Sequence, residues 1–203
     1  MNQSEPSKRI EMKNGLWIGL IVSISLLGCN QSEYQKMLKR ELDRNVRYDS
    51  LFLGISFGMD AKDFYTHCWQ LNKKGLIMQG PSNLSVQYEL HKPEVNSKVF
   101  MWFYPDFKDN KISKMPVEFS YESFAPWNKE MSSDSLLVEV KDLFEKWYGG
   151  KFIKETNEAG DKTVWVKVDG NRRIRLYKKS ISTVRGDFTD MTLVNEEVEN
   201  SEE

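Results

Sequence analysis

Cysteine and histidine are scarce in this chain, which has two of each among 203 residues. So few of them exclude most metal clusters and any framework of several disulfides, and we expect no metal and no cofactor. Charge of one sign is not in excess, because 29 basic residues balance 30 acidic ones and the net charge is −1. We therefore expect no nucleic-acid partner.

Long apolar runs are missing as well. The longest covers residues 16–27, whereas a helix needs about 20 residues to cross a bilayer. With 12 glycines and 6 prolines, the chain is not a low-complexity sequence. Its 39% of hydrophobic residues are enough for a packed core, and its length fits one domain with extensions.

A basic segment precedes the apolar run, and this order is typical of an export signal. The run ends in Leu26-Leu27-Gly28-Cys29, which resembles the lipobox of bacterial lipoproteins with a type II signal peptide. The resemblance implies cleavage between Gly28 and Cys29, a diacylglycerol group on the Cys29 sulfur, and an acylated amino terminus, palmitate being the expected fatty acid. An ordinary secretory signal or an uncleaved anchor helix, with Cys29 incidental, is the alternative.

The same resemblance predicts a location. The chain would be lipid-anchored in the cell envelope, and Asn30 in place of an aspartate favours the outer membrane. The face of that membrane stays open, and so does the true start, because Met12-Lys13 also looks like the beginning of a leader. Organisation and composition resemble lipoproteins of Bacteroidota-type bacteria.

Hydrophobic periodicity predicts two similar units in the exported part. Each has a helix that ends at a glycine, Gly75 or Gly149, and is followed by three strands. The hairpin signal Asp169-Gly170 joins two of the strands. We expect helices at about residues 33–46, 61–74 and 134–148, and strands at about 50–59, 84–90, 99–104, 117–121, 164–168, 174–176 and 184–194.

These elements predict an α+β fold, in which two helix-plus-meander units form a mostly antiparallel sheet with the helices on one face. The expected order is a signal peptide at 1–28, a lipidated tether at 29–33 and a single ectodomain at 34–194, with units at about 50–122 and 132–194. The acidic tail at 195–203 is expected to be disordered.

One short segment adds a fold resemblance. Residues Phe57 to Phe64 read Phe-Gly-Met-Asp-Ala-Lys-Asp-Phe, which resembles the strand–Gly-Met–helix opening of SmpA/OmlA-type outer-membrane lipoproteins and of the fold of the β-lactamase inhibitor protein. Those families have Ser or Thr at the position of Asp60, so only the fold is carried over and no binding site.

The sequence contains no motif with the residue spacing of a known type of catalytic site, and we predict no catalytic residue. His67, His91, Asp106 and Asp109 are the groups that an enzyme could use if the fold gathered them. Cys68 would be the one thiol left after lipidation of Cys29, either as a small buried hydrophobe or as a reactive free thiol.

Two surfaces could bind a partner. Arg173, Arg175 and Lys179 alternate along one strand, and we expect Trp165 and Lys167 to lie beside them on a basic face. That face would suit a polyanion, a phospholipid headgroup or an acidic protein, or it is an ordinary solvated face. Aromatic residues could form a second surface for sugars or a partner, and Trp127 is the best candidate; the others are Trp102, Tyr104 and Pro126.

Taken together, the sequence predicts a lipid-anchored envelope protein that acts as a non-catalytic binding or assembly module. Its partners would be the membrane, through the lipid, and an envelope protein. A surface protein that binds glycans or polymers is the second hypothesis, and a hydrolase whose site forms only in three dimensions is the third.

Overall fold

The helices form where apolar residues recur at the spacing of one helix face. The computed structural model of the chain describes residues 32–157, 160 and 162–193. Within them α2 spans Glu33–Asp43, α3 spans Ala61–Lys73 and α4 spans Ser133–Tyr148. Helix α4 buries Leu136, Val140 and Phe144, which are four residues apart along one face. The helix ends agree with the prediction, except that α2 ends at Asp43 rather than at residue 46.

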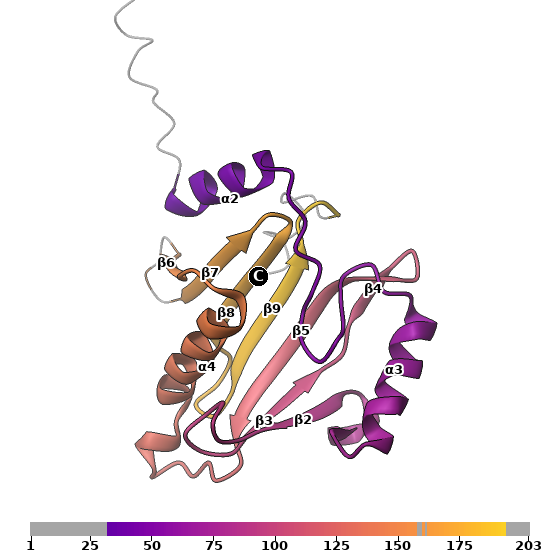
Figure 1. The fold of residues 1–203 in the computed structure, drawn as a ribbon. Coiled ribbons are helices and arrows are strands. Elements are labelled where there is room, and N and C mark those ends of the chain that lie inside the picture. The colour runs from indigo at the N-terminus through magenta and orange to yellow at the C-terminus, as the bar shows by residue number, and fades with distance from the viewer. Residues whose placement is uncertain (1–31, 158–159, 161, 194–203) are drawn as a thin grey trace, which may run out of the picture. The chain divides into compact units, whose positions relative to one another are not determined.

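Nine strands of the described part form one antiparallel sheet in the order β1-β2-β3-β5-β9-β8-β7-β6, with β4 paired to β5 (Figure 1). The two predicted three-strand meanders are β2-β3-β5 and β7-β8-β9, and β5 and β9, the last strand of each, join them. Strands β1 and β6, which were not among the predicted strands, extend the sheet at its two edges. The strands are β1 Ile77–Gln79, β2 Val86–Leu90, β3 Val99–Phe103, β4 Asp106–Lys108, β5 Lys111–Tyr121, β6 Ile153–Thr156, β7 Thr163–Asp169, β8 Arg172–Lys178 and β9 Val184–Asp190.

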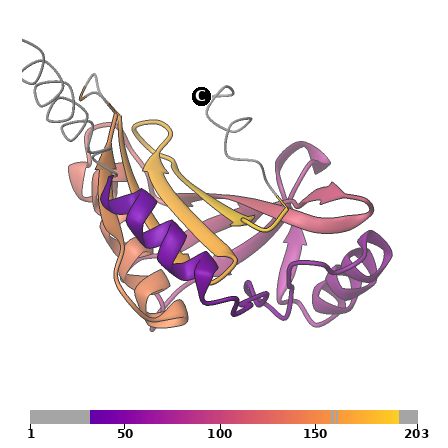
Figure 2. The same cartoon turned by 90° about the horizontal axis from the view of Figure 1, so that it is seen from above.

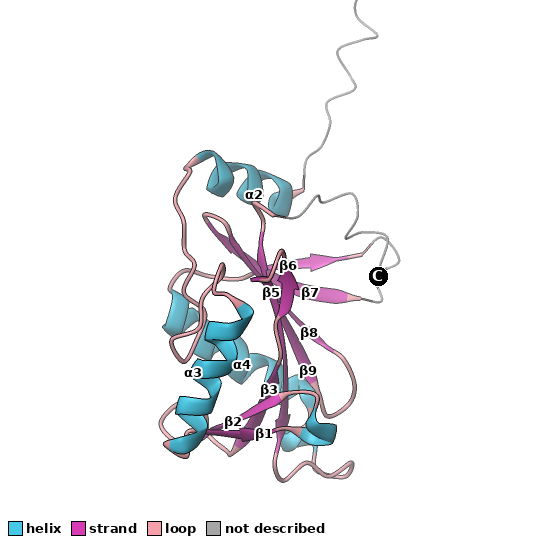
Figure 3. Cartoon of the chain, turned by 90° about the vertical axis from the view of Figure 1, so that its right-hand side faces the viewer, coloured by secondary structure: helices cyan, strands magenta, loops and turns pink. Residues whose placement is uncertain are grey.

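One face of the sheet carries the main core. Residues directly opposite each other on antiparallel strands share a face, and the pairs Met101–Phe119 and Ile174–Phe188 place these side chains on the same one. Helices α3 and α4 cover that face (Figure 3). The rings of Phe119, Phe144 and Phe188 pack together beneath α4. The predicted α+β fold with a mostly antiparallel sheet is thus confirmed.

Helix α2 is the exception to the expectation that helices share one face. Its buried Met37 and Leu38 pack on Val166 and Val168 of β7, with Met191, in a separate small cluster. The pairs Val166–Arg175 and Val168–Arg173 place this cluster on the face opposite α4. Figure 2 shows α2 and α3 at opposite ends of the twisted sheet.

The predicted strand at residues 50–59 is wrong. The segment is a looped turn with one isolated bridge, Ser50–Ser56. Leu53 and Gly54 both have positive φ, which reverses the chain there. The alternation still reports burial, because Leu51, Ile55 and Phe57 all point into the core.

Strand β5 is longer than expected. It begins at Lys111 and runs through Pro116, which lies inside the strand rather than at its entrance. Residues Asp109 and Asn110, both at positive φ, make the turn between β4 and β5.

Several predictions fall outside the described residues: the signal peptide at 1–28, the modified Cys29 with its cleavage site, most of the tether, and the tail at 195–203. In the part that the structure describes, no helix has the length and apolar character needed to cross a membrane.

Candidate functional site

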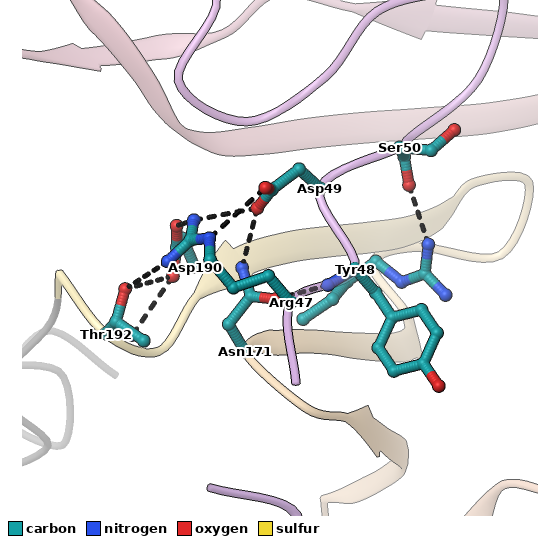
Figure 4. A network of polar contacts seen from close by, with 8 residues as sticks. Arg47, Tyr48, Asp49, Ser50, Asn171, Asp190 and Thr192 are labelled. Atoms are coloured by element: carbon teal, nitrogen blue, oxygen red, sulfur yellow. Dashed lines mark hydrogen bonds and ion pairs between the residues drawn. The ribbon is translucent and has the colours of Figure 1, made fainter. Parts of the chain in front are cut away.

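Residues 47–50, which follow α2, are fastened to the far end of the chain. The Asn171 side chain accepts a hydrogen bond from the Tyr48 amide (2.6 Å) and donates one to Asp49 (3.0 Å). The Arg47 guanidinium lies between two carboxylates, with 2.7 Å to Asp49 and 2.7 Å to Asp190 (Figure 4). This network holds the start of the loop at 48–53 against the β7–β8 turn and the end of β9.

Asp190 is the buried centre of this network, with a side chain that is 1% exposed. Burial alone would raise its pKa, but hydrogen bonds from Thr192 and from Arg47 outweigh burial, so the pKa is lowered from its ordinary value. The Arg47 pKa is raised in turn by its hydrogen bonds to Asp49 and Asp190. The network is therefore charged at neutral pH.

An Asp190→Asn variant is expected to lose about 2 kcal/mol of unfolding free energy at neutral pH, because Arg47 loses its buried carboxylate partner and keeps only the more exposed Asp49. A lowered native pKa stabilises the fold above the unfolded-state pKa and stops doing so as the pH falls through the native value. The difference between native chain and variant should therefore shrink as the pH falls below about 4. Urea unfolding at several pH values measures it.

The matched control is Asp134→Asn. Asp134 also pairs with a cation, Lys178, but its side chain is 75% exposed. An exposed pair contributes about 0–1 kcal/mol, so this variant should unfold almost like the native chain. Equal losses in both variants would contradict the role given to Asp190.

The loop at 48–53 forms one wall of a cavity of about 530 Å³. A volume of that size is typical of small-molecule sites, which lie at roughly 300–1,000 Å³. Three segments far apart in sequence complete the wall: β2–β3 with the loop between them, the end of α4, and the start of β8. Five of the lining residues are aromatic, and the full set is Tyr48, Ser50, Leu51, Phe52, Leu53, Tyr88, Glu94, Met101, Trp147, Tyr148 and Arg172.

Arg172 is the cation of this cavity, and it is 5% exposed. Its Nη1 donates to the Ser50 carbonyl oxygen at 2.6 Å, and its Nη2 donates to Asp169 at 3.1 Å. The guanidinium carbon lies 4.4 Å from the centre of the Tyr148 ring and 5.8 Å from that of Tyr48. Its Nε has no acceptor among the described residues. A buried donor left without a partner costs about 1–3 kcal/mol.

Asp169 serves two buried cations. Its carboxylate pairs with Arg172 and also with Lys167, which is 3% exposed. The Lys167 amine also lies beside Gly150 at the end of α4, and the end of a helix carries partial negative charge. One carboxylate is thus shared by two buried cations, of which Arg172 lines the cavity.

The acid of the cavity is Glu94, which accepts a hydrogen bond from the Tyr88 hydroxyl at 3.3 Å. Burial raises the Tyr88 pKa, and the neighbouring Glu94 charge raises it further. Burial also raises the pKa of Tyr148, whose hydroxyl donates to the Leu51 carbonyl at 2.8 Å. Both phenols therefore stay neutral and act as hydrogen-bonding walls. Such a cavity can hold a flat apolar group and orient it with a few polar contacts.

The predicted basic face is not assembled as expected. Trp165 pairs with Leu176 and Lys167 with Ile174, so both lie on the core face and not beside Arg173 and Arg175. Trp165 packs against the core, with the Lys141 amine 5.8 Å from its ring centre. The prediction that Trp165 and Lys167 share the arginine face is wrong.

Arg173, Arg175 and Lys179 differ in their surroundings. Arg173 is buried and donates to the Tyr34 hydroxyl of α2 at 3.0 Å, so α2 contacts it. Arg175 lies 3.8 Å from Asp187, and Lys179 pairs with Glu118 at 2.6 Å. Arg175 and Lys179 thus each lie beside a carboxylate.

The aromatic candidates divide into two places. Trp127 is 86% exposed in the loop before α4, next to the exposed Pro126. Trp102 and Tyr104 instead line a second hollow of about 380 Å³, together with Pro116 and Arg185. The structure does not join the two groups, and binding at Trp127 stays a prediction.

Cys68 and the histidines are not brought together with acids. The Cys68 side chain is half-buried on α3, and burial raises its pKa to about 11. The ring of His67 lies 2.7 Å from the Leu53 carbonyl, where it holds the loop at 48–53. Among the described residues, no three His, Cys, Asp or Glu side chains gather as a metal site. His91, Asp106 and Asp109 are exposed at separate places.

Sequence reasoning missed the cavity and Arg172. No motif joins the four segments of the cavity wall. The available signal was the hairpin, because Arg172 follows its turn directly and begins a strand with a basic residue. Comparisons of this chain with protein-family models, with curated proteins and with solved structures find no match.

Proposed function

We propose that this chain is a lipid-anchored, non-catalytic binding module of the bacterial cell envelope. The observation that carries the binding role is the cavity of about 530 Å³ with five aromatic rings in its wall. Its polar groups are held by each other or by backbone oxygens, as in the contacts of Arg172 with Ser50 and of Tyr148 with Leu51. Groups fixed in this way suit recognition of a ligand.

The leader supports the anchoring half of the proposal. Its apolar run is too short to span a bilayer, and it ends in the Gly28-Cys29 pair that resembles a lipobox. Acyl chains contribute about 0.8 kcal/mol for each buried CH₂, so two or more chains make attachment durable. Only a few residues separate Cys29 from α2, which begins at Glu33.

The cavity is tested with phenylpropanol, an uncharged molecule with one aromatic ring. The full chain in detergent should show saturable binding in a ligand-observed NMR titration, after subtraction of a detergent blank. Tyr48→Ala should weaken that binding about three- to tenfold, because ring contacts contribute about 0.5–1.5 kcal/mol beyond the area they bury.

Tyr65→Ala is the control, since Tyr65 is also a partly exposed tyrosine but lies on α3 with its hydroxyl 2.6 Å from that of Tyr104. It should bind the probe as the native chain does. Absence of saturable binding to the native chain, or equal weakening in both variants, would overturn the binding role of this cavity.

A further inference from the structure

We infer that the cavity selects a ligand with a flat apolar body and a single anionic group, which the guanidinium of Arg172 recognises. This inference rests on the proposed function and adds the ligand's chemical class. It also makes Arg172 the specificity-determining residue, rather than the arginines farther along β8.

The first ground is the arginine itself. Arg172 lines the cavity while 5% exposed, and its Nε has no acceptor among the described residues. Its other two nitrogens are already used by Ser50 and Asp169, which fix the plane of the guanidinium. A guanidinium carries five N–H donors, and Ser50 and Asp169 take one each from Nη1 and Nη2, so donors remain for an oxygen of a bound anion. Such a charge-assisted hydrogen bond is among the strong ones in proteins.

The second ground is the charge balance. The Asp169 carboxylate is divided between Lys167 and Arg172, and both cations are at least nine-tenths buried. The cavity's own acid, Glu94, is bound to the Tyr88 hydroxyl. A negative group on the ligand would therefore balance the positive charge of Arg172. Glu94 would repel a ligand that carries further negative charge. A single anionic group fits both residues.

The third ground is the shape of the surroundings. Tyr148 stacks on the guanidinium, and Trp147 lies in the same wall. The aromatic side chains can contact the apolar body of a ligand, while the fixed arginine beside them binds its anionic group. A ligand with only an apolar body or only an anionic group would contact only part of the cavity wall.

The test compares three probes that share one aromatic body and differ in charge: phenylpropanoate, phenylpropanol and phenylpropylamine. With the full chain in detergent, the anion should bind about tenfold more tightly than the alcohol, and the amine should bind most weakly. Arg172→Gln should remove the preference for the anion, whereas Glu94→Gln should strengthen binding of the anion by about threefold. Ligand-observed NMR titrations measure all three.

The outcomes separate the two proposals. If the alcohol binds and the anion binds no better, the cavity is a site but its assigned ligand class is wrong. If none of the three binds, the proposed function fails and the inference fails with it. Arg172 also holds Ser50, so Arg172→Gln is first checked by its urea midpoint. Should it not fold, the probe series on the native chain and on Glu94→Gln still decides, and an anion that binds no better to Glu94→Gln overturns the inference.

Discussion

Radioactive palmitate is expected to label the native chain and to leave the Cys29→Ala variant unlabelled. The thiol of Cys29 is the acceptor that the lipobox resemblance implies, and alanine has no atom that can carry a thioether-linked lipid. Without the acyl chains, the variant should also leave the membrane fraction or keep its leader uncleaved. Labelling followed by gel electrophoresis and membrane fractionation measures both effects.

Cys68→Ala is the matched control, because it removes the other cysteine of the chain. Cys68 is half-buried on α3 and its pKa is raised to about 11, so it is a poor acceptor. This variant should keep its label. A label that persists in Cys29→Ala, or a native chain with a free Cys29 thiol and an intact leader, would contradict the anchor.

A Gly170→Ala variant is expected to lose about 3 kcal/mol of unfolding free energy, which combines the strain of a left-handed backbone with overpacking. Gly170 forms the β7–β8 turn at φ +52, and a Cβ there would overlap the carbonyl oxygen of Val46. It would also lie 3.1 Å from the ring of Tyr48. The loop that forms one wall of the cavity would be pushed off the hairpin. Urea unfolding measures the loss.

Gly160→Ala separates strain from contact. Gly160 also has a positive φ, +74, but a Cβ there would meet no atom of the described residues within 4 Å. Its loss should be limited to the strain, about 1 kcal/mol. If both variants lost the same free energy, contact between the hairpin and residues 46–48 would not matter for stability.

The helices and the meanders could be predicted because each depends on local periodicity. In α4, Leu136, Val140 and Phe144 recur every four residues, and Gly149 follows the last turn. Glycine ends many helices because it adopts conformations that other residues avoid. The pairing of the two meanders through β5 and β9 needs no further motif, since each meander buries one apolar face and both faces lie under the same pair of helices.

The face of Trp165 could have been predicted and was not. A turn of two residues places positions of opposite parity across from each other, so Val166 must lie opposite an odd-numbered residue, here Arg175. The expectation that Trp165 and Lys167 lie on the face of the arginines assigned the faces of the strand by apolar character rather than by the parity of the turn. The structure resolves the conflict with α2, which covers Val166 and Val168 on the second face.

The turn at 50–59 and the cavity could not be predicted from a single sequence, for a different reason. Alternation of apolar residues reports burial, and Leu51, Ile55 and Phe57 are buried without forming a strand. The cavity depends on contacts such as Arg172 with Ser50, which are 122 positions apart. Local pattern carries no information on such pairs.

The large sequence distance between the contacting residues also affects when the chain can fold. The segment after α2 has its partners in the β7–β8 turn and at the end of β9, up to 145 positions later in the chain. Helix α2 itself packs on Val166, Val168 and Met191, so it has no surface to dock on until those residues have been synthesised. Contacts between distant positions also slow folding, because a long loop must close before they form. Synthesis of this chain would therefore run ahead of its folding, and the export that we propose would meet a chain that is still unfolded.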